Sequence, residues 1–293
     1  MAIILESNQQ IEYLNQAIPI VRNALAEDIG DRDITTEELL SSDVVLAGEL
    51  IAKQPGVAAG MEVAKLTFRI LDERVRFDAK VSDGGAIACG QVLATISGSG
   101  RALLGGERVA LNFLQRMCGI ATLTKKYVEA VRGTAAIILD TRKTMPGLRI
   151  LDKWAVRAGG GQNHRQGLYD AVLIKENHIT SVGSISDAIK RMRNKAPSDF
   201  VEVEVKNLEE LREAISLKVD RVLLDNMKPD DLREAVRISG GRVPLEASGN
   251  VTLENVAEIA KTGVHYISIG SLTHSAKALD ISFLIDSNPR TIR

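Results

Sequence analysis

The stretch VEVEVKNLEELREAISLKVDRVLLDN, residues 201–226, decides the fold because it has the pattern of a complete βαβ unit. Its two ends, 201–205 and 221–225, are short apolar runs typical of strands. The segment between them carries Leu and Ile at helical spacing after an acidic first turn. Strands spaced by roughly 20 residues leave room for a helical crossover, so we expect parallel strands with a right-handed connection.

The same repeat extends to both sides of this unit. Strand-like runs recur downstream at 244–248 and 266–270 and upstream at 135–140 and 170–175, which gives six strands in series. Helix-like segments such as KPDDLREAVRI and TLENVAEIAKTG separate the later strands. This alternation predicts a closed or nearly closed α/β barrel rather than a doubly wound sheet.

Residues 1–107 have a different organisation. A helix-like stretch at 9–29 is followed by short strand-like runs broken by glycine, and the segment 82–100 has the glycine-punctuated rhythm of a small β sandwich. We therefore predict a separate α+β domain here. A long helix is predicted at 107–133, with Met117 among its core positions.

The composition is that of a globular protein with a near-neutral charge. The chain has 293 residues, 45% of them hydrophobic, with 37 basic against 38 acidic residues and 3% aromatic residues. The low aromatic content and the lack of a basic stripe argue against nucleic acid as a partner. The sequence has neither a signal-peptide pattern nor an apolar run long enough for a membrane span, so a cytoplasmic location and no membrane partner are expected.

The cysteines and the absence of several familiar motifs argue against other classes of function. Cys89 and Cys118 have no paired or metal-like spacing, so both are predicted to be buried, inert thiols. The motifs GxxxxGK[ST], GxGxxG after a strand, and GxSxG do not occur. ATP hydrolysis, nicotinamide hydride transfer and serine hydrolysis are therefore disfavoured.

Cationic side chains gather around the triple glycine at 159–161. Because the whole chain is near neutral, this local excess predicts a site for a small, multiply negative partner. Lys153 and Arg157 are four apart on a predicted helix at 148–158 and suit a solvated helix face. That interpretation suits Arg142, Lys143 and Arg165 less well, and a functional role is predicted where Arg142 and Lys143 follow a strand-like run. His164, next to Arg165, could cap or orient an anion.

Carboxylates are expected beside these cations. The period of two in VEVEV puts Glu202 and Glu204 on the same strand face. Asp225 ends the next strand, so Glu204 and Asp225 should stand side by side at the mouth of the barrel. Two hard oxygen ligands in this position favour Mg²⁺, held together with a substrate phosphate. A salt bridge to Lys143 or Lys175 without metal is the alternative.

The loops after the last two predicted strands have the composition of a phosphate site. One contains Ser248, Gly249 and Asn250, and the other contains Gly270 and Ser271. Barrel folds commonly bind a phosphate after their final strands, where small residues leave backbone N–H groups free. A plain loop remains the alternative for each segment.

Together, eight segments resemble the quinolinate phosphoribosyltransferase family over nearly the whole chain. They are EDIGDRDIT, ERVALNFLQRMCGIAT, DTRKTMPGLR, GGGQNHRQGLYDAVLIKENH, VEVEV, LLDN, EASGN and ISIGSLTHS. The resemblance implies an N-terminal α/β sandwich domain at 1–107 and an incomplete, open α/β barrel of TIM-like type at 108–273. It also implies that the tail at 274–293 returns to the N-terminal domain.

The resemblance implies an activity as well. Phosphoribosyl pyrophosphate and quinolinate would give nicotinate mononucleotide, pyrophosphate and CO₂ with Mg²⁺, a step of de novo NAD biosynthesis. Lys143, Lys175, Glu204 and Asp225 would be catalytic, with Glu204 and Asp225 as the metal ligands. The substrate-binding set would be Arg108, Thr141, Arg142, Lys143, His164, Arg165, Lys175, Glu204, Asp225, Ser248, Gly249, Asn250, Gly270 and Ser271.

The quaternary structure is a further implication of the resemblance. Arg108 lies at the start of the predicted bridging helix, before the barrel strands, and would act across the interface of a homodimer or homohexamer.

Two alternatives to this activity stay open from the residues. One is a relative of the family that does not act on quinolinate, such as the molybdate-operon protein or a phosphoribosyltransferase that prefers nicotinate. The presence of all five cationic residues argues against it; they are Arg142, Lys143, His164, Arg165 and Lys175. A non-catalytic barrel that binds a phosphorylated metabolite is disfavoured by Glu204 and Asp225, because a pure anion site gains nothing from carboxylates.

Overall fold

The computed structural model describes residues 7–195, 200–286 and 290–291, and the chain divides into two compact units. The first unit comprises residues 1–125, 144–160 and 273–293, and the second comprises residues 126–143 and 161–272. The boundary expected at residue 107 falls inside a helix, and that helix belongs to the first unit as far as Lys125.

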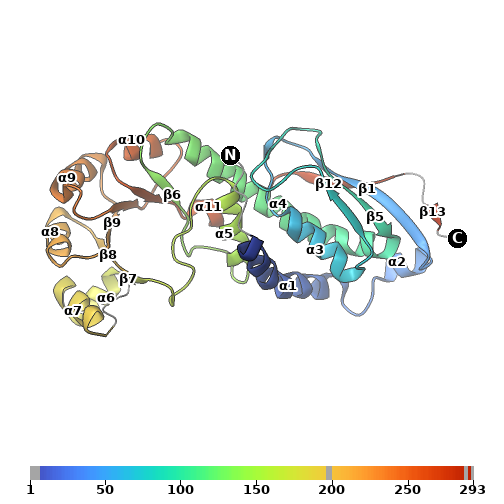
Figure 1. Cartoon of the computed structure of the whole chain (residues 1–293), viewed down its shortest axis with the longest axis horizontal. Coiled ribbons are helices and arrows are strands. Elements are labelled where there is room, and N and C mark those ends of the chain that lie inside the picture. Colours follow the sequence, from blue (N-terminus) through green and yellow to red (C-terminus); the bar gives the residue numbers. More distant parts are fainter. Residues whose placement is uncertain (1–6, 196–199, 287–289, 292–293) are drawn as a thin grey trace. The chain divides into compact units, whose positions relative to one another are not determined.

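An antiparallel sheet forms the centre of the first unit (Figure 1). Strand β1 (Val44–Ala52) pairs with β5 (Val92–Ser99) on one side and with the C-terminal strand β12 (Ile281–Ile285) on the other. The remaining strands are β3 (Arg76–Ala79) beside β5, β13 (Arg290–Thr291) beside β1, and the separate pair β2 (Gly56–Val57) and β4 (Ala86–Ile87). The segment after residue 280 therefore completes a sheet that begins near residue 44.

The helices of the first unit form its second layer. They are α1 (Ser7–Ile29), α2 (Ile34–Leu39), α3 (Met61–Leu71), α4 (Gly100–Ala130) and α5 (Arg149–Ala158). Of these, α3 and α4 pack on this sheet through apolar faces, and α1 packs against α3 and α5. The core between helices and sheet includes Leu50, Phe68, Leu93, Leu103 and Leu114, each fully buried. The Phe68 ring lies 5.9 Å from that of Phe283 on the returning strand β12, so the C-terminal segment contributes to this core.

The long helix begins earlier than the sequence predicts. Helix α4 starts at Gly100 rather than at residue 107, which makes it 31 residues long, and Met117 is buried as predicted. A side chain at Gly159 would place its Cβ only 2.5 Å from the Ala121 carbonyl oxygen of α4. Glycine at position 159 is therefore required by the close approach of the two backbones.

The prediction that Lys153 and Arg157 lie on a solvated face of α5 is wrong for Lys153. Lys153 is buried with 1% of its surface exposed, whereas the half-buried Arg157 stacks over the Trp154 ring at 5.6 Å. The i,i+4 spacing does not distinguish an exposed stripe from a helix packed on both sides. Every α5 residue from Leu151 to Val156 is buried, because neighbouring elements cover this helix almost completely.

The second unit is built on a parallel sheet of six strands, as the repeat pattern predicts. The strands are β6 (Ile137–Leu139), β7 (Val172–Ile174), β8 (Val201–Val205), β9 (Arg221–Asp225), β10 (Leu245–Ser248) and β11 (Tyr266–Ser268). Their order in the sheet is β6-β11-β10-β9-β8-β7, so β6 and β7 are the two edges. The barrel is therefore not closed by hydrogen bonds.

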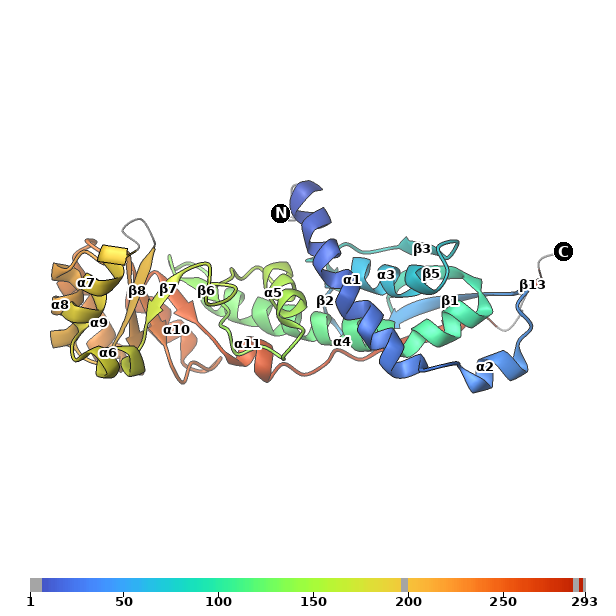
Figure 2. The same ribbon diagram turned by 90° about the horizontal axis from the view of Figure 1, so that it is seen from below.

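Helices connect these strands and lie along the sheet (Figures 1 and 2). They are α6 (Glu176–Val182), α7 (Ile185–Lys195), α8 (Leu208–Ser216), α9 (Pro229–Ser239) and α10 (Val256–Lys261), and the short α11 (Ser271–His274) follows the last strand, β11. The Asn207 side chain accepts hydrogen bonds from the first N–H groups of α8, and Pro229 occupies the first turn of α9. These signals explain why both helices begin immediately after a strand and its loop.

Two further expectations concern thiols and membranes. Cys118 is buried, as predicted, and burial raises its pKa to about 12. Cys89 is exposed in the turn after β4, so the prediction that both thiols are buried is wrong for this one.

Within the described ranges, no helix combines the length and apolarity that a membrane span needs.

Candidate active site

The carboxyl ends of the six parallel strands bring the predicted site residues to one edge of the second unit. Parallel strands end on the same side of a sheet, so residues far apart in the sequence meet there. Residues 141–143 follow β6, Lys175 follows β7, Glu204 lies near the end of β8 and Asp225 ends β9. Ser248 ends β10, and Gly270 follows β11.

Asp140 holds the cationic loop on the end of β6, and sequence reasoning missed it. Its fully buried carboxylate accepts hydrogen bonds from Asn163 Nδ2 at 2.6 Å and from the His164 backbone N–H at 2.9 Å. Gln162 also forms a parallel bridge with Leu139. The position was visible in the sequence as the acid that ends the apolar run before Arg142. Its partners were not, because they lie more than twenty residues downstream.

Two arginines form the most cationic point of the site. Burial lowers the pKa of Arg165, and the positive charge of Arg142 lowers it further. Arg165 Nη1 donates to the Ala171 carbonyl at 3.0 Å. The buried Nε of Arg142 has no hydrogen-bond partner among the residues that the structure describes. A buried guanidinium donor without a partner, at the end of a parallel strand, suits an anion that carries more than one oxygen.

The two lysines lie at exposed positions. Lys143 follows Arg142 after β6, and Lys175 precedes the first residue of α6. Thr141 is half-buried, and its hydroxyl accepts a hydrogen bond from the Lys143 backbone N–H at 3.0 Å. This hydrogen bond closes a turn over residues 141–143, which contain three of the predicted binding residues.

The predicted metal ligands occupy adjacent strands, as expected. Glu204 on β8 is in register with Leu223 on β9, and Asp225 lies two residues beyond Leu223. The two carboxylates therefore share one face of the sheet as diagonal neighbours. Glu204 Oε1 accepts from the Glu176 backbone N–H at 3.4 Å, and both acids are half-buried. Hard carboxylate oxygens in this arrangement fit Mg²⁺ completed by substrate oxygens and water.

The glycine-containing loops after β10 and β11 lie next to each other. Ser248 is in register with Ser268 of β11, and Asn250 Nδ2 donates to Asn226 Oδ1 at 3.0 Å. Gly249 has a φ of 94°, and a Cβ there would lie 2.1 Å from Asn226 Oδ1. Asn226 follows β9, so only glycine at position 249 allows the loop after β10 to approach the loop after β9 this closely.

The beginning of α11 completes this end of the site. Ser271 follows Gly270, and its buried hydroxyl has no hydrogen-bond partner in the described part of the chain. A ligand oxygen could satisfy that hydroxyl, which agrees with the expected phosphate role.

A buried polar cluster lies inside the barrel on the same sheet face. It consists of His164, Glu202, Arg221 and Glu246, which we call the interior cluster. His164 Nε2 lies 3.0 Å from Glu202 and 3.6 Å from Glu246, and Arg221 Nη1 donates to Glu246 at 3.0 Å. Burial, followed by the charge of Glu202, raises the pKa of Glu246 to about 7.

The interior cluster also has the spacing of a possible metal site. Ligand atoms of His164, Glu202 and Glu246 lie within 4.8 Å of one another. Arg221 already supplies a positive charge to Glu246, and its guanidinium lies 4.2 Å from the centre of the Tyr266 ring. Sequence reasoning placed Glu202 on the polar strand face but did not identify Glu246 or Arg221.

Arg108 is the one predicted site residue that lies in the first unit. It is exposed on α4, within the third turn rather than at the start of the helix, because α4 begins at Gly100.

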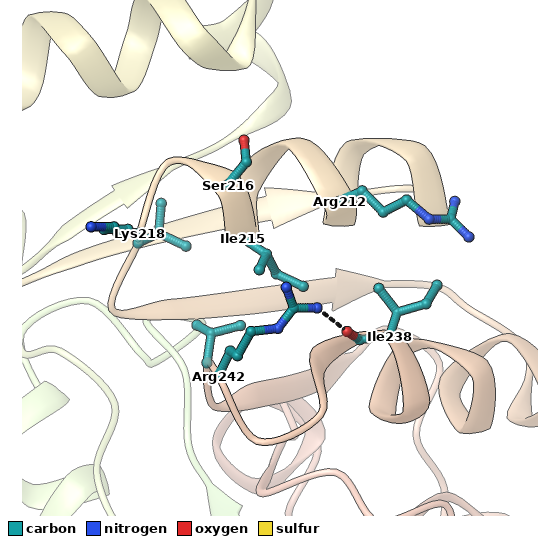
Figure 3. Close-up of a pocket in the computed structure, with 8 residues that line it drawn as sticks. Arg212, Ile215, Ser216, Lys218, Ile238 and Arg242 are labelled. Atoms are coloured by element: carbon teal, nitrogen blue, oxygen red, sulfur yellow. Dashed lines mark hydrogen bonds between the residues drawn. The ribbon is translucent and has the colours of Figure 1, made fainter.

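A surface hollow of about 570 Å³ lies at the opposite ends of the strands (Figure 3). Lys218 precedes β9 and Val243 precedes β10, so this hollow faces the amino ends of the sheet. Figure 3 shows the Arg242 guanidinium turned toward Ile215 and bonded to the Ile238 carbonyl. The hollow contains none of the predicted site residues.

Comparison with known proteins identifies matches over both units. Residues 33–118 match the family model described as "Quinolinate phosphoribosyl transferase, N-terminal domain", and residues 120–284 match the corresponding C-terminal domain. A Bacillus subtilis protein named "Probable nicotinate-nucleotide pyrophosphorylase [carboxylating]" is 45% identical over 264 residues, which cover 90% of this chain and 91% of that protein.

Two further proteins with similar names also match most of this chain. The "Nicotinate-nucleotide pyrophosphorylase [carboxylating]" of Mycobacterium leprae is 46% identical over 270 residues, which cover 89% of this chain and 94% of that protein. The crystal structure of NadC from Streptococcus pyogenes superposes with a TM-score of 0.90 at 40% identity, covering 95% of this chain and 98% of that one.

Proposed function

We infer that this chain, which belongs to the quinolinate phosphoribosyl transferase family, transfers the 5-phosphoribosyl group of phosphoribosyl pyrophosphate to quinolinate with loss of CO₂. The products are nicotinate mononucleotide, pyrophosphate and CO₂, as a step of NAD biosynthesis. The observation that carries this assignment is that Arg142 and Lys175 follow the carboxyl ends of the parallel strands β6 and β7, with the buried Nε of Arg142 left for an anion.

The cationic residues suit a dicarboxylate. Arg142 and Arg165 can each form a two-pronged contact with a carboxylate of quinolinate, and Lys175 adds a third charge nearby. Lys143 suits the diphosphate of the sugar substrate, and Ser248, Gly249, Asn250, Gly270 and Ser271 suit its 5′-phosphate. These contacts hold the pyridine nitrogen against the ribose carbon that it attacks.

The reaction then needs no protein nucleophile. The ring nitrogen forms a bond to ribose C1 while the bond from C1 to pyrophosphate breaks. The resulting pyridinium is an electron sink, so the carboxylate next to the nitrogen can leave as CO₂, and the carbon that carried it takes up a proton. The arginines and lysines stabilise the charges of the bound ring and the departing diphosphate through fixed positive groups.

We further propose Glu204 and Asp225 as the residues that hold Mg²⁺, because they are hard oxygen donors on one face of adjacent strands. Bound Mg²⁺ would neutralise charge on the diphosphate leaving group. An ion pair of Glu204 with Lys143 or Lys175 remains the alternative use of this carboxylate.

Chelation and substitution test the metal proposal. EDTA is expected to abolish turnover, and added Mg²⁺ to restore it. Glu204→Gln and Asp225→Asn remove the anionic ligands while keeping side-chain size, so each should raise the Mg²⁺ concentration needed for half-maximal activity by about tenfold or more. Titrating Mg²⁺ at saturating substrates measures this. An unchanged Mg²⁺ requirement in both variants would assign the metal to substrate oxygens and water alone.

The reaction itself is tested with purified protein, Mg²⁺, phosphoribosyl pyrophosphate and either quinolinate or nicotinate. Nicotinate mononucleotide and CO₂ are expected from quinolinate. Product from nicotinate alone would favour the relative with another substrate, and tight binding without turnover would favour the non-catalytic barrel.

We also propose that the active form is a homodimer or homohexamer in which Arg108 completes the quinolinate site of a neighbouring subunit. The exposed position of Arg108 on α4 agrees with a contact made outside its own chain. The cytoplasmic location stays an expectation.

Subunit complementation tests the role of Arg108. Arg108→Ala and Lys143→Ala are each expected to lower activity by about 10- to 100-fold, because either removes a charge-assisted contact worth about 1.5 to 3 kcal/mol. Mixing the two variants should restore part of the activity, since hybrid interfaces contain one intact site. Subunit exchange is verified separately with tagged chains. No recovery despite proven exchange would count against action across the interface.

A further inference from the structure

The chain passes between its two units at positions that border the predicted site. It crosses after residues 125, 143, 160 and 272. Lys143 is the last residue before the second of these crossings. Ser271 shares the short helix α11 with Thr273, the residue at which the first unit resumes. The site loops 141–143 and 270–271 are therefore both continued directly by segments of the first unit.

One ion pair within the first unit holds both of these segments. Arg116 of α4 donates to the two carboxylate oxygens of Asp152 on α5 through its Nε and Nη2, each at 2.8 Å. The same Nη2 donates to the Thr273 backbone carbonyl at 3.1 Å. Asp152 Oδ2 also accepts the Met145 backbone N–H at 3.2 Å. The segment that follows Lys143 and the segment that follows Ser271 thus share one guanidinium–carboxylate pair.

This pair, together with its two backbone contacts, is a rigid anchor. The Asp152 side chain is fully buried, the Arg116 side chain is 24% exposed, and Thr273 is 1% exposed. A planar bidentate pair fixes orientation as well as distance. Helix α5 is also held at a second point, where Trp154 Nε1 donates to Asp83 at 2.7 Å. The anchored segments are therefore fixed relative to each other.

We propose that Arg116 is a positioning residue, which holds the loop that contains Lys143 and the loop that contains Ser271 at a fixed separation. This inference rests on the proposed function, in which Lys143 meets the diphosphate of phosphoribosyl pyrophosphate and Ser271 its 5′-phosphate. The two loops then bind opposite ends of one substrate. A fixed separation preorganises the site for the whole substrate, because both ends are matched before it arrives.

The whole substrate and its parts should respond differently to loss of the anchor. Phosphoribosyl pyrophosphate spans both loops, whereas pyrophosphate and ribose 5-phosphate each occupy one. Arg116→Lys keeps a positive charge beside Asp152 but loses the planar fork that serves Asp152 and Thr273 together. The variant should bind phosphoribosyl pyrophosphate about tenfold more weakly than the wild type, and each fragment nearly as well.

Isothermal titration calorimetry in the presence of Mg²⁺ measures these three dissociation constants. Unchanged binding of phosphoribosyl pyrophosphate by Arg116→Lys would overturn the proposal. Equal weakening of the substrate and of both fragments would also overturn it, because each loop would then be damaged separately rather than displaced from the other.

Asp152→Asn tests the same anchor from its other side. Asparagine keeps one acceptor oxygen where the carboxylate has two, so it cannot hold Arg116 and Met145 as the carboxylate does. This variant should also lose more affinity for phosphoribosyl pyrophosphate than for either fragment. The double variant should lose no more than the weaker-binding single variant, because both changes act through one contact. Additive losses would contradict a shared anchor.

Two control variants separate positioning from a general loss of stability. Arg101→Lys makes the same change on the same helix, at an arginine that donates to the Leu40 carbonyl through Nε at 3.1 Å and Nη2 at 2.8 Å. Leu50→Ala truncates a fully buried side chain of the first-unit core and should lower stability. Both controls should bind phosphoribosyl pyrophosphate as the wild type does. If Leu50→Ala weakened binding as much as Arg116→Lys, the effect would be one of stability and the proposal would be wrong.

Steady-state kinetics give a second readout. In Arg116→Lys the KM for phosphoribosyl pyrophosphate should rise about tenfold, and the KM for quinolinate should change less, because quinolinate does not span the two loops. A larger rise in the KM for quinolinate would contradict the proposal. A wild-type protein that binds phosphoribosyl pyrophosphate without converting quinolinate would sink the proposed function and leave the calorimetric comparison interpretable. No binding of phosphoribosyl pyrophosphate by the wild type would overturn both.

Discussion

Replacing Asp152 with alanine is expected to lower the free energy of unfolding by about 3 to 5 kcal/mol. Asp152 on α5 is fully buried and accepts two parallel hydrogen bonds from the Nε and Nη2 of Arg116 on α4, each 2.8 Å long. It also accepts the Met145 backbone N–H at 3.2 Å. Truncation would leave a largely buried guanidinium without its counter-ion, which is far less favourable than losing both partners together.

Chemical denaturation of the intact chain measures this effect, with a matched comparison to separate charge from packing. Asp152→Asn keeps the size and one acceptor oxygen, so its loss of stability should be smaller than that of Asp152→Ala. Arg74→Ala removes an arginine that also donates two hydrogen bonds to its partner, Asp72, but whose side chain is 82% exposed, so it should change stability far less than Asp152→Ala. Similar losses of stability for Asp152→Ala and Arg74→Ala would show that burial does not determine how much each ion pair contributes to stability.

The architecture of the second unit could be predicted because each of its strands and helices can be identified from its own short stretch of sequence. Each strand and helix between residues 201 and 270 is encoded by its own apolar period, and the short spacing between strands forces parallel connections. The incomplete closure could not be derived in this way. Whether β6 and β7 meet depends on strand tilt and stagger, which apolar periodicity does not encode.

The sequence predicted the positions of those site residues that lie at or just after the end of a strand. Glu204 and Asp225 were placed on adjacent strands by counting, and the structure has them there. Asp140 and Glu246 were missed because their partners come from other elements. Glu246 sits in LEAS, an ordinary strand in the sequence, and only the three-dimensional barrel brings Arg221 and His164 to it. Burial of Lys153 was missed for the same reason.

Arg142→Ala and Arg165→Ala are each expected to raise the KM for quinolinate by about 10- to 100-fold, because each removes a charge-assisted contact worth about 1.5 to 3 kcal/mol. Quinolinate carries two carboxylates and nicotinate one, so the variants should also discriminate less between them as competing ligands. Steady-state kinetics and competition by nicotinate measure both effects.

Arg165→Lys provides the matched control for the geometry of this contact. Lysine keeps the charge but has no planar fork, so it should recover only part of the quinolinate affinity if the arginine binds a carboxylate through two N–H groups. Full recovery would mean that charge alone is needed at this position. Unchanged KM values in both alanine variants would remove the guanidinium pair from the quinolinate site. The buried Nε of Arg142 would then need another ligand, because a buried donor without an acceptor is strongly unfavourable.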